Sequence, residues 1–191
     1  MTPRAFTVTN VAPTAAFTAT PQQIFQGELA TLAFSQQSDP SPADTQAGFT
    51  YAYDCTASGT LSVANNRAAT ATCKYLKAGT FTTGGTIKDK DLGATSYTAS
   101  VKVLSPQDAL SGLRAQVVAL DLNATRTSDL TTKIDNSLQK LAQGQKADAS
   151  KQLQDFIKKV NDIVQQQTLT AAQSKVLTDT ANRIIASIAV S

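Results

Sequence analysis

The stretch FTYAYDC, residues 49–55, decides the fold of the first half of this chain. Its aromatic and cysteine side chains fall on every second position, so Phe49, Tyr51, Tyr53 and Cys55 share one face of an extended segment. Alternation with a period of two is the pattern of a strand with one buried face. The stretch therefore predicts a β-strand whose aromatic face points into a core.

Four more short segments around this stretch follow a similar pattern. They lie at 29–34, 71–75, 81–87 and 97–103, and clusters of Gly, Pro, Ser and Asp separate them. About seven short strands with frequent turns in roughly 100 residues are typical of an Ig-like sandwich. We expect an all-β Ig-like sandwich over residues 1–104.

The composition changes after residue 104. All four tyrosines and six of the seven phenylalanines precede this point, whereas Leu, Ala, Gln, Lys and Asp dominate after it. Apolar residues then recur at helical spacing, which predicts an all-α four-helix bundle over residues 105–191. The expected helix starts are the Ser105-Pro106 pair, a position near Thr127, a position before Leu153, and the capping box Thr170–Gln173.

Composition excludes several classes of protein. The net charge of +3 over 191 residues is small, and the sequence has no basic stripe of the kind that binds nucleic acid. No run approaches the ~20 apolar residues that span a bilayer. Met1–Arg4 lacks an apolar h-region, so we expect no signal peptide in this sequence; it fits a cytosolic protein or a fragment of a longer secreted chain. We expect a monomer.

Catalysis is not expected. The sequence contains no histidine, which removes Ser-His-Asp and Cys-His systems and the commonest general base. Carboxylate-only chemistry would need paired acids in a cleft, and the sequence gives no sign of such a pair. Gly84-Gly85 lacks the Lys-Thr of a phosphate loop. We therefore expect neither an enzyme nor a cofactor.

Cys55 and Cys73 are the only cysteines. Two cysteines without histidine give too few ligands for a zinc site, and their spacing differs from that of a redox Cys-x-x-Cys pair. Each shares a strand face with tyrosines, so the two sulfurs can meet in the core if both faces point inward. We expect a structural disulfide, with two buried free thiols as the alternative, and an even cysteine count fits an oxidising compartment.

Several aspartates are candidate calcium ligands, although we assign no metal site. The candidates are Asp89 and Asp91, with Asp39, Asp44 or Asp54 as further oxygen ligands. The segment DKDLG, residues 89–93, lacks the spacing of an EF-hand loop. Asp-x-Asp-x-Gly is also an ordinary hairpin turn in which aspartate bonds its own backbone, and this interpretation is favoured.

The first half resembles the polycystic-kidney-disease (PKD) type of Ig-like domain. The segments that carry the resemblance are VAPTA at 11–15, GE at 27–28, SDP at 38–40, CKY at 73–75, GTF at 79–81 and DKDLG at 89–93. The family's Trp-Asp-Phe-Gly-Asp-Gly signature is reduced here to YDCTASG at 53–59, which indicates a divergent, cysteine-containing branch.

The second half resembles the FIMAH domain, a small C-terminal helical domain of bacterial surface proteins and secreted hydrolases. The matching segments are QLQDFIKKVN at 152–161, LTAAQ at 169–173 and ANRII at 181–185. This resemblance implies no established catalysis. It implies an extracellular accessory module in a longer chain.

Together these observations predict a non-catalytic module of a larger bacterial surface or secreted protein. It would act as a spacer or adhesion unit and would contact other domains of its chain or a cell-surface protein. The alternative is an appendage that binds polysaccharide for a secreted hydrolase. The absence of tryptophan and the core parity of most of the tyrosines disfavour that alternative.

Overall fold

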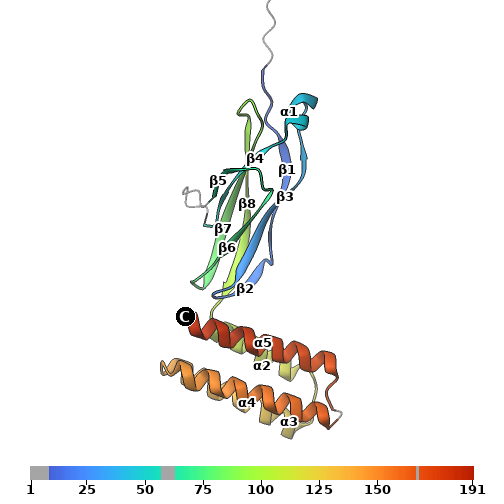
Figure 1. The fold of residues 1–191 in the computed structure, drawn as a ribbon. Coiled ribbons are helices and arrows are strands. Elements are labelled where there is room, and N and C mark those ends of the chain that lie inside the picture. Colours follow the sequence, from blue (N-terminus) through green and yellow to red (C-terminus); the bar gives the residue numbers. More distant parts are fainter. Residues whose placement is uncertain (1–8, 57–62, 167) are drawn as a thin grey trace, which may run out of the picture. The chain divides into compact units, whose positions relative to one another are not determined.

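The computed structural model describes residues 9–56, 63–166 and 168–191 (Figure 1). The chain separates into two compact units, each described by itself below. The first unit holds residues up to Gln23, Leu29–Lys74 and Thr80–Lys102. The second holds Ile24–Glu28, Tyr75–Gly79 and Val103–Ser191.

The β-strands form two sheets, as expected for an Ig-like sandwich. The three-stranded sheet has the order β1 (Thr14–Thr20), β3 (Leu29–Ser38), β6 (Thr70–Lys74). The five-stranded sheet has the order β2 (Gln23–Phe25), β8 (Ala94–Leu104), β7 (Gly79–Lys88), β4 (Thr50–Asp54), β5 (Val63–Asn66). β3 pairs antiparallel with β1 and β6, and β4 pairs antiparallel with β5 and β7.

Phe34 of β3 lies at the centre of the sandwich core. Its ring centroid is 4.8 Å from that of Phe17 on the same sheet, and 5.2 Å and 5.7 Å from those of Tyr51 and Tyr53 on the other sheet. Tyr53 is fully buried, and its hydroxyl donates to the Ala68 carbonyl at 2.8 Å. Burial raises the pKa of Tyr53 to about 12. The aromatic face predicted for residues 49–55 is therefore part of the core.

Gly85 of β7 lies directly against these rings. A Cβ at this position would lie 2.7 Å from Phe34 Cζ and 2.8 Å from Phe17 Cζ, closer than real Cβ contacts allow. The adjacent Gly84 has room, since its Cβ would meet the Asp54 Cβ at 3.6 Å. Packing in the sandwich core therefore requires a residue without a side chain at position 85, and it does not require one at position 84.

A disulfide joins the two sheets. Cys55 follows β4 of the five-stranded sheet, and Cys73 lies in β6 of the three-stranded sheet. The Cα atoms are 5.6 Å apart, and the bond closes a loop with a sequence separation of 18 residues. This is the expected disulfide. Residues 57–59 of the divergent signature segment lie outside the described residues.

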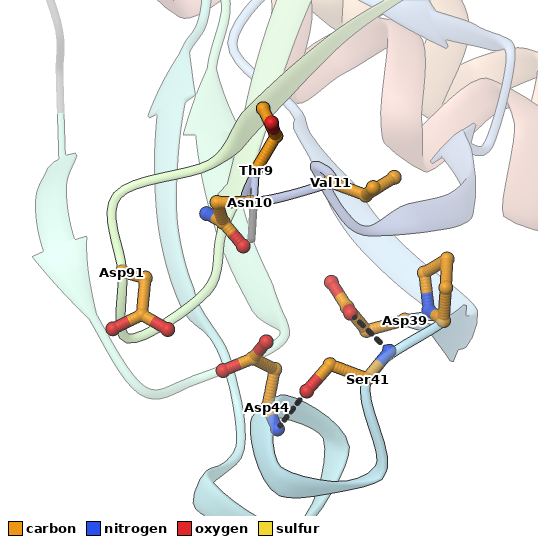
Figure 2. A pocket seen from close by; sticks show the side chains of 8 residues that line it. Thr9, Asn10, Val11, Asp39, Ser41, Asp44 and Asp91 are labelled. Carbon is orange, nitrogen blue, oxygen red and sulfur yellow. Dashed lines mark hydrogen bonds between the residues drawn. The ribbon is translucent and has the colours of Figure 1, made fainter. Parts of the chain in front are cut away.

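A short helix, α1 (Pro42–Ala47), follows β3 where the sequence analysis expected only a turn. Ser41 is its N-cap, and the Ser41 hydroxyl accepts a hydrogen bond from the Asp44 N–H at 3.4 Å (Figure 2). Pro42 occupies the first turn, where its missing N–H costs nothing. The Ser-Pro pair is thus a helix start here as well as at Ser105-Pro106.

Four longer helices follow the sandwich. They are α2 (Pro106–Val118), α3 (Ala124–Ala142), α4 (Lys146–Gln165) and α5 (Ala171–Val190). Ser105 and the Thr170–Gln173 capping box cap α2 and α5 as predicted. α3 begins three residues before the predicted Thr127, because the Asn123 side chain accepts from the Arg126 N–H at 3.0 Å and supplies the N-cap.

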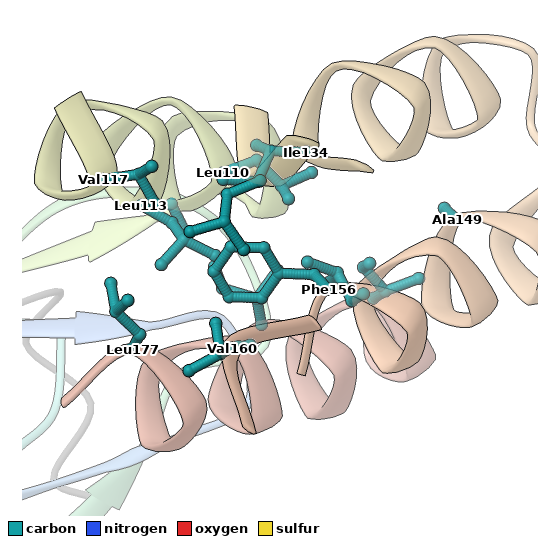
Figure 3. Close-up of a cluster of buried hydrophobic side chains, with 14 of the residues drawn as sticks. Leu110, Leu113, Val117, Ile134, Ala149, Phe156, Val160 and Leu177 are labelled. Carbon is teal, nitrogen blue, oxygen red and sulfur yellow. The ribbon is translucent and has the colours of Figure 1, made fainter. Parts of the chain in front are cut away.

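Phe156 of α4 anchors the core of the helical unit and is fully buried. Figure 3 shows its ring among side chains from the surrounding helices. The other labelled residues come from α2 (Leu110, Leu113, Val117), α3 (Ile134), α4 (Ala149, Val160) and α5 (Leu177). Phe156, the one aromatic residue after residue 104, is therefore a packing anchor.

Arg183 of α5 is also held within the second unit. Its guanidinium lies 4.2 Å from the centroid of the Phe25 ring and donates to both carboxylate oxygens of Glu28, at 2.6 Å and 2.8 Å. Burial alone would raise the pKa of Glu28, but hydrogen bonds from Arg183 and the Phe25 N–H lower it. Across the described residues, no helix is long and apolar enough to cross a membrane.

Candidate functional site

A pocket of about 510 Å³ lies in the first unit, where three separate segments meet. The segment before β1 contributes residues 9–11, the segment after β3 contributes residues 39–41 and Asp44, and the turn between β7 and β8 contributes Asp91. Figure 2 shows the carboxylates of Asp39, Asp44 and Asp91 around this space. We call it the acidic pocket.

Asp39 follows directly after β3 and is 8% exposed. Its Oδ1 atom accepts a hydrogen bond from the Ser41 N–H at 2.8 Å, which fixes the turn into α1. Its Oδ2 atom is buried and has no hydrogen-bond partner. A buried oxygen without a donor is costly, so this atom is a candidate ligand for a cation.

Asp44 in α1 is 3% exposed, and its Oδ1 atom lies 2.9 Å from the Lys90 ammonium. The hydrogen bond from Lys90 lowers the pKa of Asp44 most, and the hydrogen bond from Ser41 lowers it further. Lys90 also forms an ion pair with Asp91 at the exposed tip of the β7–β8 turn. Asp44 is therefore held as a carboxylate, with an ammonium as its partner.

Asp89 organises the turn between β7 and β8. Its Oδ1 atom accepts hydrogen bonds from the Asp91 N–H and the Gly93 N–H, both at 2.8 Å, and its Oδ2 atom accepts from Asn10 Nδ2 at 2.9 Å. A Cβ at Gly93 would overlap Asp89 Oδ2, so this turn needs a glycine there. These are the backbone bonds expected of an aspartate in a hairpin turn.

The structure brings Asp39, Asp44 and Asp89 together, with one carboxylate oxygen of each within 4.8 Å of the others. All three are buried. Asp91, named from the sequence as a candidate beside Asp89, lines the pocket but has a side chain 52% exposed. Asp54 is not in the group; it ends β4, and its Oδ1 atom accepts from the Thr56 N–H at 2.9 Å.

Close carboxylates are also a feature of glycosidase sites, and the sequence analysis expected no paired acids in a cleft. General acid catalysis needs a carboxyl group whose pKa is raised, so that it holds a proton to donate. Lys90 instead lowers the pKa of Asp44, and both oxygens of Asp89 accept N–H hydrogen bonds. The arrangement suits binding a cation better than donating a proton.

A second pocket, of about 380 Å³, lies on the helical unit between the end of α2 and the start of α5. Its lining is mainly apolar and includes Leu120, Val176 and Leu177. Val176 is 57% exposed, so the pocket is continuous with an apolar surface. It carries no charged side chain in its lining and offers no catalytic group.

None of the aromatic side chains of the described residues is fully exposed, and Phe17, Phe81 and Tyr97 are half-buried. Tyr51, Tyr53 and Tyr75 are buried. Tyr97 is half-buried, and its hydroxyl accepts from the Ala15 N–H at 2.9 Å. The described part of the chain therefore has no fully exposed aromatic ring that could stack on a sugar ring.

Several solved structures align with about half of this chain. One is a chain from work on carbohydrate-binding modules of the β-sandwich superfamily, with 26% identity and a TM-score of 0.43 over 51% of this chain and 36% of that chain. The aligned region thus spans about a third of that protein. The PKD1 domain of Vibrio anguillarum Epp aligns with 21% identity and a TM-score of 0.36 over 50% of this chain and 96% of that domain.

The PKD1 domain of the Vibrio cholerae metalloprotease PrtV aligns with 22% identity and a TM-score of 0.36, over 49% of this chain and 98% of that domain. No curated protein matches the sequence. The model of the FIMAH domain family matches residues 108–186, from the first turn of α2 to near the end of α5. The helical part of this chain is therefore similar to FIMAH domains over residues 108–186.

Proposed function

We propose that this chain is a non-catalytic module of a larger bacterial surface or secreted protein, acting as a spacer and as a unit for protein interaction. The observation that carries the proposal is the FIMAH match over residues 108–186, in a chain that also has a sandwich with its own core and a disulfide. A disulfide fits an oxidising, extracellular compartment. Neither unit contains, among its described residues, a set of side chains arranged for catalysis.

The apolar pocket between α2 and α5 supports the interaction role. Side chains such as Val176 and Leu120 leave apolar surface open to solvent, and such surface is characteristic of partner contacts. The lack of exposed aromatic side chains among the described residues disfavours the alternative, a polysaccharide-binding appendage. Sugar binding is nevertheless the outcome that the first experiment must be able to detect.

That experiment is a depletion assay on insoluble cellulose, chitin and xylan. The purified chain is mixed with each polymer, and the protein left in the supernatant is measured over a range of polymer concentrations. We expect no more depletion than for the reduced and alkylated chain, which serves as the control. Saturable binding in the micromolar range, lost on reduction and alkylation, would contradict the spacer role and establish the polysaccharide-binding alternative.

We also propose that the acidic pocket binds a divalent cation, with calcium as the best fit. Calcium takes six to eight oxygen ligands in flexible geometry, from carboxylates, carbonyls and water. Asp39, Asp44 and Asp89 would supply the carboxylates. The specific observation in favour is the buried Oδ2 atom of Asp39, which no protein donor satisfies.

This second proposal is tested by thermal unfolding after treatment with EDTA. Added calcium should raise the melting temperature of the sandwich, because a ligand at ten times its Kd stabilises a fold by about 1.4 kcal/mol. Asp39→Asn keeps an acceptor for the Ser41 N–H but removes the charge, so it should abolish most of the shift. Asp162→Asn, at an exposed position of α4, is the matched control. An equal calcium shift in both variants would refute the site.

A further inference from the structure

We infer that the Lys90 ammonium is the counterion of the acidic pocket. It weakens cation binding there and must leave Asp44 before a divalent cation enters. The inference rests on the proposed cation site and concerns its regulation. Lys90 is the residue between Asp89 and Asp91 in the β7–β8 turn. Its ammonium contacts Asp44 Oδ1 at 2.9 Å and also bonds Asp91.

No other lysine or arginine of the described chain forms an ion pair with these acids. Lys90 pairs with Asp44 and Asp91, and it is the one ion-pair partner that the described residues supply to the four aspartates at 39, 44, 89 and 91. The Asn10 amide and backbone N–H groups supply the other donors, and they carry no full charge. Lys90 is thus the residue that offsets the like charges of the cluster when no metal is bound.

The ammonium lies against a carboxylate that the metal needs. Asp44 is one of three carboxylates that converge within 4.8 Å, and its Oδ1 atom already contacts Lys90. A divalent ion on the same carboxylate would face a positive charge a few ångströms away, and this repulsion is strong in a partly buried site. Cation binding is therefore an exchange, in which the metal replaces the ammonium.

The local structure permits this exchange. The Lys90 side chain is 44% exposed and that of Asp91 is 52% exposed, so both can move into solvent without disturbing a core. The lysine ammonium is well hydrated and sits on a flexible stem, which favours its release. Asp39, Asp44 and Asp89 are buried and stay in place. The pocket thus combines a fixed set of ligands with a movable positive charge.

Two consequences follow. The affinity for calcium should be low, in the range of about 10⁻⁴ to 10⁻³ M that is typical of extracellular calcium-binding modules. The sandwich should also remain folded without the metal, because the ammonium offsets the charge of the acids in its absence. Replacing Lys90 with a neutral residue should raise the affinity for calcium and lower the stability of the sandwich without the metal.

The test measures the calcium Kd by isothermal titration calorimetry, and the melting temperature in EDTA, for the full chain. Lys90→Met should bind calcium at least about tenfold more tightly than the wild type, because the repulsion is removed, and should melt at a lower temperature in EDTA. Lys90→Arg keeps the charge and should keep the weak affinity. Lys74→Met is the control, since Lys74 is exposed and pairs with Leu29, at the opposite end of β3 from Asp39.

The outcomes separate the two proposals. If the wild type binds calcium and Lys90→Met binds it no more tightly, Lys90 is not a counterion of the site and the inference is wrong. If neither protein binds calcium, the proposed cation site itself fails. Lys90→Gln retains a donor for Asp44 and takes the place of the Met variant if that variant does not fold in EDTA. A purely structural role of Lys90 would lower the melting temperature equally with and without calcium and would leave Kd unchanged.

Discussion

Replacing Gly85 with alanine should destabilise the sandwich through one identifiable clash. The new methyl group would lie 2.7 Å from Phe34 Cζ and 2.8 Å from Phe17 Cζ, so both rings must shift. Phe34 is 4% exposed and contacts aromatic rings of both sheets, which leaves it little room. Gly84→Ala on the same strand is the matched control, because its methyl group meets the Asp54 Cβ at an ordinary 3.6 Å.

The expected loss follows from two opposing effects. Overpacking a well-filled core costs about 1–3 kcal/mol. Replacing glycine with alanine restricts the unfolded chain and returns about 0.4–1 kcal/mol where the backbone permits it. The net loss for Gly85→Ala should therefore be about 1–2 kcal/mol, whereas Gly84→Ala should be neutral or slightly stabilising.

The assay uses the distribution of aromatic residues. Tyr51, Tyr53 and Tyr97 lie in the first unit, and the sequence contains no tryptophan, so tyrosine fluorescence in urea reports mainly on the sandwich. Circular dichroism at 222 nm follows the helices separately. Phe17→Leu should relieve the clash, so the double variant with Gly85→Ala should lose less stability than the sum of the two single losses.

Additive losses in this double-mutant cycle would refute the argument, because residues in direct contact are expected to couple by at least about 0.5 kcal/mol. A Gly85→Ala variant as stable as Gly84→Ala would refute it as well. Either result would mean that the rings repack freely and that the glycine is not required at this position.

Three further predictions concern other features of the chain. Reducing the bond between Cys55 and Cys73 should lower the stability of the sandwich by about 3 kcal/mol in the chain-entropy model, measured by urea unfolding with and without reductant. Leu92 has φ 71° and is 80% exposed, so Leu92→Asn should raise the melting temperature by relieving part of the roughly 1–2 kcal/mol of left-handed strain. The folded-state pKa of Glu28 lies below its usual 4.5, so its stabilising contribution is complete above that pH and is lost as the pH falls through the folded value. The Arg183→Met variant should therefore show a shallower loss of helical stability below about pH 4.5, and an unchanged acid profile would disprove the role of this pair.

The sequence predicted the features that depend on local patterns. The period-two face of residues 49–55 identified Tyr51 and Tyr53 as core residues, because side chains on alternate positions of a strand must share one face. Helix caps were found where a Ser-Pro pair or a capping box stands next to helical periodicity. The short helix α1 was missed although Ser41-Pro42 carries the same signal, since six residues are too few to show periodicity.

The acidic pocket could not be predicted as a unit. Its buried carboxylates, Asp39, Asp44 and Asp89, come from segments up to 50 residues apart, and only the order of the strands brings them together. The sequence identified each as a possible oxygen ligand, and it correctly gave the turn bonds of Asp89. It held no signal for the lone oxygen of Asp39 or for the contact between Lys90 and Asp44, because both depend on tertiary packing.

The bond between the two sheets also limits how far this chain can lengthen under tension. If a pulling force unfolds the sandwich, the backbone between Cys55 and Cys73 is not stretched, because the disulfide carries the load across this segment. With a sequence separation of 18 and about 3.5 Å per extended residue, roughly 60 Å of contour length remains hidden until the bond is reduced. A protein that carries this module would thus extend further under the same load in a reducing medium than in an oxidising one.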